Sequence, residues 1–202
     1  MASVVEEIAG IQSLLRAKRG LEAEAAARRL QQHYPSRGDV NHALAIALIR
    51  QDKDGEAIVF AKAALKAEPR NAAYLVNLGR LYLKYEVVED ALPLLEKAMR
   101  LDPSLYESPR ALGEFFHQVG NGHRAVAYLK QALAISPPGQ RDQIKMQLVE
   151  VISSLGQTEE AESLLKPLAE IGRFRKEALV QLASLRRHKI ESSIFSQLQR
   201  EL

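Results

Sequence analysis

Apolar residues recur along this chain at the spacing of amphipathic helices. The sequence consists of similar units that follow one another, and each unit has a leading and a trailing half. In the leading half, a large, a small and another large residue stand at positions i, i+1 and i+4, as in Leu78, Gly79 and Tyr82. This spacing places all three on one face of a helix. The trailing half carries apolar residues at i, i+4 and i+7, and a short polar stretch such as 120–123 separates the halves. The pattern predicts pairs of helices packed as antiparallel hairpins.

The hairpins repeat with a fixed period of 34 positions. Four prolines, Pro35, Pro69, Pro103 and Pro137, stand one period apart, and an alanine stands twelve positions before each of them. A fifth alanine, Ala161, follows after 36 positions, so the junction after Pro137 is expected to hold two extra residues. Such a period indicates units that bury their apolar faces against one another.

Prolines and small polar residues predict where the helices begin and end. The four periodic prolines are expected to end each second helix, because proline lacks an amide donor and disfavours helical geometry in the residue before it. Pro167 falls inside the second helix that is expected for the fifth unit, and it predicts either a kink in that helix or an early end to it. Pro109 is expected in the first turn of a helix, directly after its cap. Four residues are predicted to be N-caps: Asp39, Asn71, Ser108 and Asp142.

These residues resemble the tetratricopeptide repeat. Leu78, Gly79, Tyr82, Ala91 and Pro103 fall on the positions of its pattern, and the unit that ends one period later matches similarly. The resemblance covers about 170 of the 202 residues when five units of this period are counted. It implies an all-α fold: an α-solenoid, coiled as a right-handed superhelix, of about five helical hairpins, with a degenerate hairpin or a capping helix at the C-terminal end.

The expected domain organisation follows from the period. The first domain, residues 1–171, is expected to hold five repeats, at approximately 4–37, 38–71, 72–105, 106–139 and 142–171. Residues 172–202 are basic and are expected to form a degenerate sixth repeat or capping helices, with residues 174–187 as a first helix and Lys189–Leu202 as a hairpin arm or cap.

The resemblance implies that the first helices line a concave groove that holds a peptide or protein segment. Helical spacing leaves one face of each first helix outside the hairpin seam, and that face carries the candidate groove residues. They are His42, Arg50, Asn77, Arg80, Lys84, Arg110, Glu114, His117, Met146, Gln147 and Glu150. The expected function is therefore a protein–protein interaction scaffold or adaptor that is not an enzyme.

Arg16, Arg50 and Lys84 also stand one period apart, which leaves two interpretations of these cations. They could meet acidic side chains or the terminal carboxylate of a bound peptide. Alternatively, each cation ends a first helix, where it offsets the helix dipole without any partner. The second interpretation is favoured, because a contribution of about 0.3 to 1 kcal/mol per site is reason enough for a cation there. Asn77, Arg80 and Lys84 form the strongest candidate cluster on one helix.

Composition excludes several classes of function. The chain is 47% apolar and 26% charged, which is typical of a globular protein, and it has no cysteine, which excludes disulfides, thiolate nucleophiles and cysteine-bound metals. A formal charge of +3 is too weak to indicate nucleic-acid binding. No stretch without charged residues exceeds ten, well short of a membrane span, and Glu6 and Glu7 argue against a secretory signal. We expect a cytoplasmic protein that binds neither nucleic acid nor membrane.

No catalytic, cofactor-binding or metal-binding residue is predicted. His117 and His123 straddle a turn, but two ligands without a third do not make a metal site. One alternative function is the N-terminal arm of a larger bacterial enzyme, of the sulfotransferase or glycosyltransferase type, whose catalytic domain is not in this chain. A further alternative is self-association through an uncapped end of the solenoid.

Overall fold

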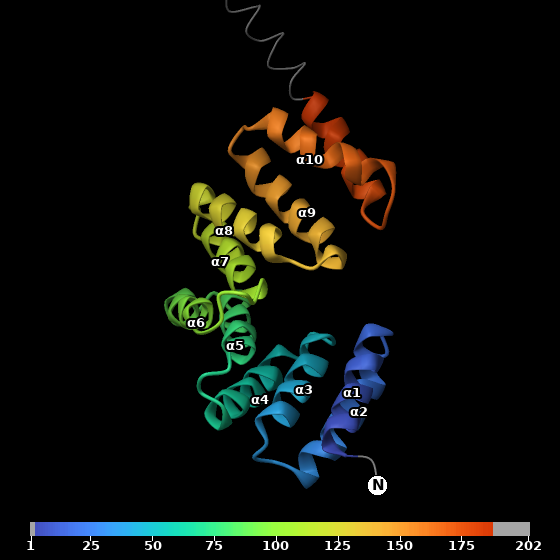
Figure 1. Cartoon of the computed structure of the whole chain (residues 1–202), viewed down its shortest axis with the longest axis vertical. Helices are drawn as coiled ribbons and strands as arrows, with labels where there is room; N and C mark the ends of the chain where they lie inside the picture. The colour runs from blue at the N-terminus through green and yellow to red at the C-terminus, as the bar shows by residue number, and fades with distance from the viewer. Residues whose placement is uncertain (1–2, 188–202) are drawn as a thin grey trace, which may run out of the picture. The chain divides into compact units, whose positions relative to one another are not determined.

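The computed structural model of the chain describes residues 3–187, and within this range the protein is all-α, as predicted, with no strand. Helices follow one another along the chain, joined by short turns (Figure 1). Residues 175–187 are also helical up to the last described position. The labelled helices are α1 Val4–Arg16, α2 Gly20–His33, α3 Gly38–Ile49, α4 Asp54–Ala67, α5 Ala72–Lys84, α6 Val88–Leu101, α7 Glu107–Gln118, α8 Gly122–Ile135, α9 Pro138–Ser154 and α10 Thr158–Glu170.

The helices gather into two compact units, and the division falls between Ala111 and Leu112, inside α7. In the first unit, α1 packs on α2, α3 on α4 and α5 on α6. Each of these pairs also contacts the next one, because α2 touches α3, α4 touches α5, and α1 reaches α3. In the second unit, α8 contacts α9, and α9 contacts α10. Within each unit, the packing is thus the nearest-neighbour stacking of a repeat protein.

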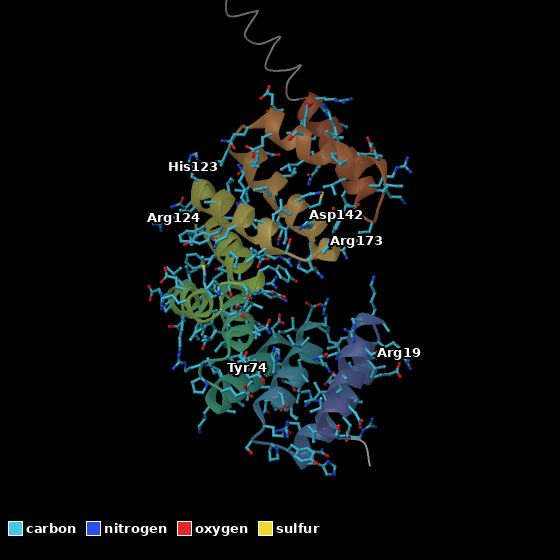
Figure 2. The ribbon with its side chains drawn as sticks, viewed as in Figure 1. Arg19, Tyr74, His123, Arg124, Asp142 and Arg173 are labelled. Atoms are coloured by element: carbon cyan, nitrogen blue, oxygen red, sulfur yellow. The ribbon has the colours of Figure 1, made fainter. Side chains whose placement is uncertain are left out.

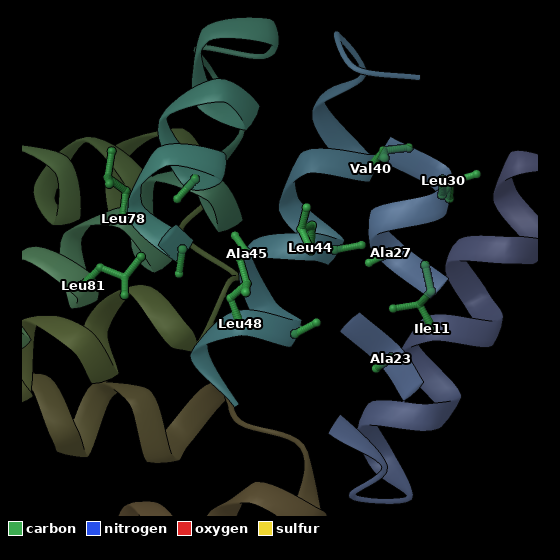
Figure 3. Close-up of a cluster of buried hydrophobic side chains, with 14 residues drawn as sticks. Ile11, Ala23, Ala27, Leu30, Val40, Leu44, Ala45, Leu48, Leu78 and Leu81 are labelled. Carbon is green, nitrogen blue, oxygen red and sulfur yellow. The ribbon is translucent and has the colours of Figure 1, made fainter. Parts of the chain in front are cut away.

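The core of the first unit alternates small and large side chains between neighbouring helices (Figure 3). Ala23 and Ala27 on α2 and Ala45 on α3 are fully buried, as are Leu44 and Leu48 on α3. Because the alanines carry no bulk, two helix backbones can approach closely and the leucines fill the remaining space. In this unit, the small periodic residues Ala23 and Ala45 therefore lie where neighbouring helices meet.

Two glycines mark the closest approaches within hairpins. A Cβ built on Gly79 of α5 would lie 2.7 Å from Cδ2 of Leu95 in α6, and one on Gly113 of α7 would lie 2.7 Å from Cγ of Leu129 in α8. Both distances are far below van der Waals contact. The same glycine–leucine contact therefore recurs one period later, within a different unit of the structure.

The predicted caps are right at one of the four positions. Asn71 is the N-cap of α5, and its side chain accepts a hydrogen bond from the backbone N–H of Tyr74 at 3.3 Å. Asp39 is not a cap, because α3 begins one residue earlier, at Gly38. Its carboxylate instead accepts a hydrogen bond from the Val40 N–H and pairs with Arg37, within the first helical turn. An acidic group in that turn still favours the helix dipole.

The other two cap predictions fail because the helices begin earlier than expected. α9 begins at Pro138 and has 17 residues, so the two extra residues of this junction enter its first turn and Asp142 lies a turn inside the helix. α7 begins at Glu107, which places Ser108 inside the helix rather than before it, and Pro109 still falls in the first turn. Pro167 does not end α10 either, because the helix continues to Glu170.

None of the helices traced between residues 3 and 187 combines the length and the apolar character needed to cross a lipid bilayer. The predicted hairpin arm or cap at Lys189–Leu202 lies outside the described residues.

Candidate functional site

The first unit brings together two predicted groove residues from adjacent first helices, His42 on α3 and Asn77 on α5. Nδ2 of Asn77 lies 2.5 Å from Nε2 of His42. The His42 ring also lies against the ring of Tyr74, labelled in Figure 2, with 4.5 Å between their centroids. The pair is separated by 35 positions in sequence, so the stacking of hairpins, rather than helical spacing, creates this contact.

The surroundings of His42 keep its imidazole uncharged at neutral pH. Burial lowers the pKa of His42 to about 4, and the nearby Glu68 carboxylate only partly opposes this effect. Burial also raises the pKa of Tyr74, whose hydroxyl donates a hydrogen bond to Oε1 of Glu68 at 3.4 Å. Neutral His42 can therefore accept the amide hydrogen of Asn77, but it offers no positive charge to an anionic ligand.

Lys84, another predicted groove residue, is held by two aspartates of the preceding hairpin. Its Nζ lies 3.2 Å from Oδ1 of Asp52 and forms a second ion pair with Oδ2 of Asp54. Asp54 opens α4 and is only 3% exposed. Hydrogen bonds from Lys84 to Asp54 and Asp52 raise the pKa of the lysine. The expectation that this cation meets only the helix dipole is therefore wrong for Lys84.

Asp52 and Asp54 are residues that the sequence interpretation missed. They lie in and just after the turn that joins α3 to α4, 32 and 30 positions before Lys84. The repeat itself contains a signal that could have identified these two aspartates. Since the ends of successive first helices stack one period apart, the turn that follows one first helix lies beside the end of the next one.

Arg16 and Arg50, the two residues that share the period with Lys84, differ from it. Arg16 lies in the last turn of α1, and Arg50 is the exposed C-cap of α3. Within residues 3–187, neither forms an ion pair. Their positions fit the helix-dipole interpretation, and they leave exposed positive charge on the first unit.

Arg80 and Arg110 both lie close enough to Tyr106 to influence its ionisation. Burial is the main cause that raises the pKa of Tyr106 to about 12, and the two guanidinium groups partly oppose it. The two arginines differ in access, because Arg80 is exposed while Arg110 is only 8% exposed. Arg110 is therefore placed to support the structure around Tyr106 rather than to reach a ligand.

The second unit pairs four of its five predicted groove residues across α7 and α9. Nε2 of Gln147 donates a hydrogen bond to Oε1 of Glu114 at 2.7 Å, and Nε2 of His117 lies 3.8 Å from Oε1 of Glu150. Met146, the fifth, is half-buried on α9. The paired residues are three positions apart on each helix, so they lie on one face of both helices.

The side chains of these residues can form hydrogen bonds and ion pairs. They offer amides, an imidazole, carboxylates and guanidinium groups on adjacent helices. Across the described part of the chain, no group of three His, Cys, Asp or Glu side chains is placed to hold a metal ion.

Comparison with known proteins places this arrangement among repeat proteins. Residues 110–142 match the family model of the tetratricopeptide repeat. A thermophilic tetratricopeptide repeat protein of Thermus thermophilus has a similar structure, with a TM-score of 0.78 and 21% identity over 91% of this chain and 98% of that one. No curated protein matches the sequence.

Two further solved structures share the fold. The PilF protein of Pseudomonas aeruginosa gives a TM-score of 0.73 at 20% identity, with 98% of this chain and 90% of that chain covered. The Cut9–Hcn1 hetero-tetramer of the APC/C gives a TM-score of 0.83 at 15% identity, over 93% of this chain but 37% of that one. At these identities, the similarity is one of fold. It does not support the alternative that this chain is the N-terminal arm of a sulfotransferase or glycosyltransferase.

Proposed function

Because this chain is a tetratricopeptide repeat protein, we propose that it is a non-catalytic interaction scaffold or adaptor that binds a peptide or protein segment against its first helices. The observation that carries the proposal is the pairing of polar side chains between adjacent first helices, His42 with Asn77 in one unit and Glu114 with Gln147 in the other. Within either unit, a peptide lying across the first helices would meet polar side chains that are already oriented by their neighbours.

We propose fewer residues for peptide contact than the sequence predicts. Arg50 is exposed and can reach a carboxylate of a ligand, whereas Lys84 is already held by Asp52 and Asp54. Asn77 is half-buried and retains one amide oxygen that can accept a hydrogen bond from a peptide N–H. In the second unit we propose Gln147, Glu114, Glu150 and Met146 as the corresponding contacts, with His117 at the edge beside Glu150.

The experiment begins with capture of the partner. The full chain, immobilised and incubated with extract of its source cell, should retain a partner that cross-linking and peptide identification can map to a short segment. Synthetic peptide of that segment then permits a titration. Arg50→Glu, and separately Asn77→Ala, should weaken peptide binding at least tenfold, since each removes a contact from the proposed face.

A matched control separates binding from general charge effects. Lys66→Glu changes the charge by the same amount as Arg50→Glu, but it lies at the exposed end of α4, a second helix. It should leave the affinity unchanged. If both Arg50→Glu and Asn77→Ala bound the peptide as tightly as the wild type, the first helices of the first unit would not be the binding surface.

The proposal also includes the repeat boundaries and the compartment of the protein. We propose that the repeats expected from the period are the functional divisions of the chain, and that the protein acts in the cytoplasm. Self-association through an end of the repeat array is a separate possibility for this scaffold, which sizing of the protein in solution over a range of concentrations would detect.

A further inference from the structure

The turns that follow α1, α3 and α5 share one backbone conformation. Lys18, Asp52 and Glu86 stand one period apart in these turns, and their φ angles are 59°, 56° and 59°. The N–H of each donates a hydrogen bond to the carbonyl three positions earlier, and the N–H of the next residue donates to the carbonyl five positions earlier. The same backbone therefore presents a different side chain at the same place in each turn.

In the second of these turns, the side chain at this place contacts the end of the next first helix. Oδ1 of Asp52 accepts a hydrogen bond from Nζ of Lys84 at 3.2 Å, and Oδ2 of Asp54 forms an ion pair with the same Nζ atom. Two acidic side chains thus surround the one cation that ends α5.

One period earlier, both acidic side chains are missing from this arrangement. The position of the first aspartate holds Lys18, that of the second holds Gly20, and that of the lysine holds Arg50. Nε2 of Gln51 donates a hydrogen bond to the carbonyl oxygen of Gly20 at 3.3 Å, so the turn after α1 lies beside the end of α3. Two cations therefore occupy the place where the next hairpin has an ion pair.

The acidic side chains close to these two turns are already paired with other cations. Glu22 pairs with Arg19, which Figure 2 labels. Glu24 pairs with Lys53, and the two aspartates of the next turn share their lysine. No carboxylate near the two turns is left to balance the cations that remain.

Three cations remain there, Arg16, Lys18 and Arg50, and we call them the basic edge. They lie in the last turn of α1, in the turn after it and at the C-cap of α3. All three are exposed, and within residues 3–187 none of them forms an ion pair. The basic edge is therefore a local excess of positive charge that attracts an anionic ligand.

We propose that the basic edge binds the carboxylates of an acidic segment in the peptide that the first helices hold. This inference rests on the proposed function and names the chemistry of the ligand. A guanidinium group can form two parallel hydrogen bonds with a carboxylate. A carboxylate between Lys18 and Arg50 takes the place that Asp52 takes beside Lys84, and it removes the repulsion between the two cations.

The basic edge suits an acidic peptide better than a nucleic acid or a free phosphate. Residues 16–19 and 50–53 include no aromatic residue on which a base could stack. The backbone N–H groups of residues 17–19 all donate to carbonyls of α1, so this turn offers no cradle of amides for a phosphate. Cations on two helix ends match carboxylates that are spaced along a peptide.

Selection from a random library of dodecapeptides on phage tests the preference for acidic ligands. Peptides that the full chain enriches should contain at least twice the share of Asp and Glu found in the unselected library. The double variant Lys18→Gln, Arg50→Gln should lose this excess. The control, Lys66→Gln with Lys97→Gln, removes two exposed cations from second helices of the same unit and should keep it.

The outcomes of the selection separate this inference from the proposed function. Enriched peptides without an acidic excess would overturn the inference and leave the proposed function standing. A selection that enriches no peptide would count against the proposed function itself. An acidic excess that persists in the double variant Lys18→Gln, Arg50→Gln would place the acidic preference elsewhere on the protein.

Titration of the most enriched peptide, labelled with a fluorophore, measures the contribution of the basic edge. A version with Asn for Asp and Gln for Glu should bind the wild type at least tenfold more weakly. The double variant Lys18→Gln, Arg50→Gln should bind the two versions within threefold of each other, because the interaction being removed is then already absent. Equal losses in the two proteins would contradict the proposal, as would displacement of the peptide by oligothymidylate at the same concentration of charge.

Cross-linking with a carbodiimide locates the bound carboxylate directly. The reagent joins the Nζ of a lysine to a carboxylate as an amide and takes up the water that is released. Lys18 should be joined to an acidic side chain of the peptide at least tenfold more than the exposed Lys66, as measured by mass spectrometry. Equal labelling of the two lysines, or none at Lys18, would show that the acidic segment does not lie at the basic edge.

Discussion

Gly79 of α5 lies directly against Leu95 of α6, so closely that a Cβ on the glycine would come within 2.7 Å of the Cδ2 atom of the leucine. The contact joins the two helices of one hairpin. Its counterpart, Gly113 against Leu129, lies in the second unit. A side chain at either glycine must displace a leucine that is almost completely buried.

Gly79→Leu should therefore lower the free energy of unfolding by about 1 to 3 kcal/mol through overpacking of this seam. Urea denaturation followed by circular dichroism measures the change. Gly55→Ala is the control, because Gly55 lies in α4 and an added Cβ there meets nothing within 4 Å. The control should be neutral or should stabilise the protein by about 0.4 to 1 kcal/mol. An unaltered midpoint for Gly79→Leu would mean that α5 and α6 do not meet at this glycine.

The ion pairs of Lys84 lead to a prediction about stability rather than binding. Lys84→Met should lower the thermal midpoint, because it leaves the buried carboxylate of Asp54 without its cation. Combining it with Asp54→Asn should recover part of the loss, since the uncompensated charge is then removed. Arg50→Met, at the equivalent position one period earlier, should change the midpoint much less. Similar losses for Lys84→Met and Arg50→Met would show that the aspartates do not depend on Lys84.

His42 predicts a loss of stability in mild acid. Its pKa is about 4 in the folded protein against about 6.5 in the unfolded chain, so between these values the unfolded state binds a proton that the folded state does not. Stability is retained above pH 6.5 and falls as the pH is lowered from about 6.5 to 4, by about 1 to 3 kcal/mol from this residue. His42→Gln should flatten the curve in this window when unfolding is measured at a series of pH values. Parallel curves for the wild type and the variant would contradict the assigned burial.

Glu24 predicts a second loss at lower pH. It is 7% exposed on α2, and its carboxylate accepts hydrogen bonds from Lys53, Arg28 and Gln51, of which the bond from Lys53 lowers its pKa most, to about 2. The folded carboxylate binds a proton less readily than the unfolded one, so its contribution is complete above about pH 4.5 and is lost as the pH falls towards 2.

Glu24→Gln should cost about 1 to 3 kcal/mol at neutral pH and should remove this acid-dependent loss. Denaturation of the wild type and the variant at pH 7, 4.5 and 2.5 measures both effects. If the difference between the two proteins were the same at all three pH values, the ion pairs of Glu24 would not contribute to stability.

The hairpins and their seams could be predicted from the chain alone. Leu78, Gly79 and Tyr82 lie on one helical face whatever surrounds them, because helical geometry relates residues three or four positions apart. The recurrence of that pattern at a fixed period then predicts hairpins of one kind, and the Gly79–Leu95 contact shows that the small residue lies where the two helices of a hairpin meet. Helical geometry and the repeated sizes of the side chains are therefore sufficient to predict the hairpins and the contacts between their two helices.

The partners of the candidate site residues could not be predicted in the same way. Asn77 meets His42, and Lys84 meets Asp52 and Asp54, across 30 to 35 positions, because stacking of one hairpin on the next sets the offset between their faces. Helix starts show the same dependence: Asn71 caps α5, while Asp39, with an equally suitable side chain, lies inside the first turn of α3. Periodicity decides which residues share a helix face, but side-chain packing between hairpins decides which residues on different faces come into contact.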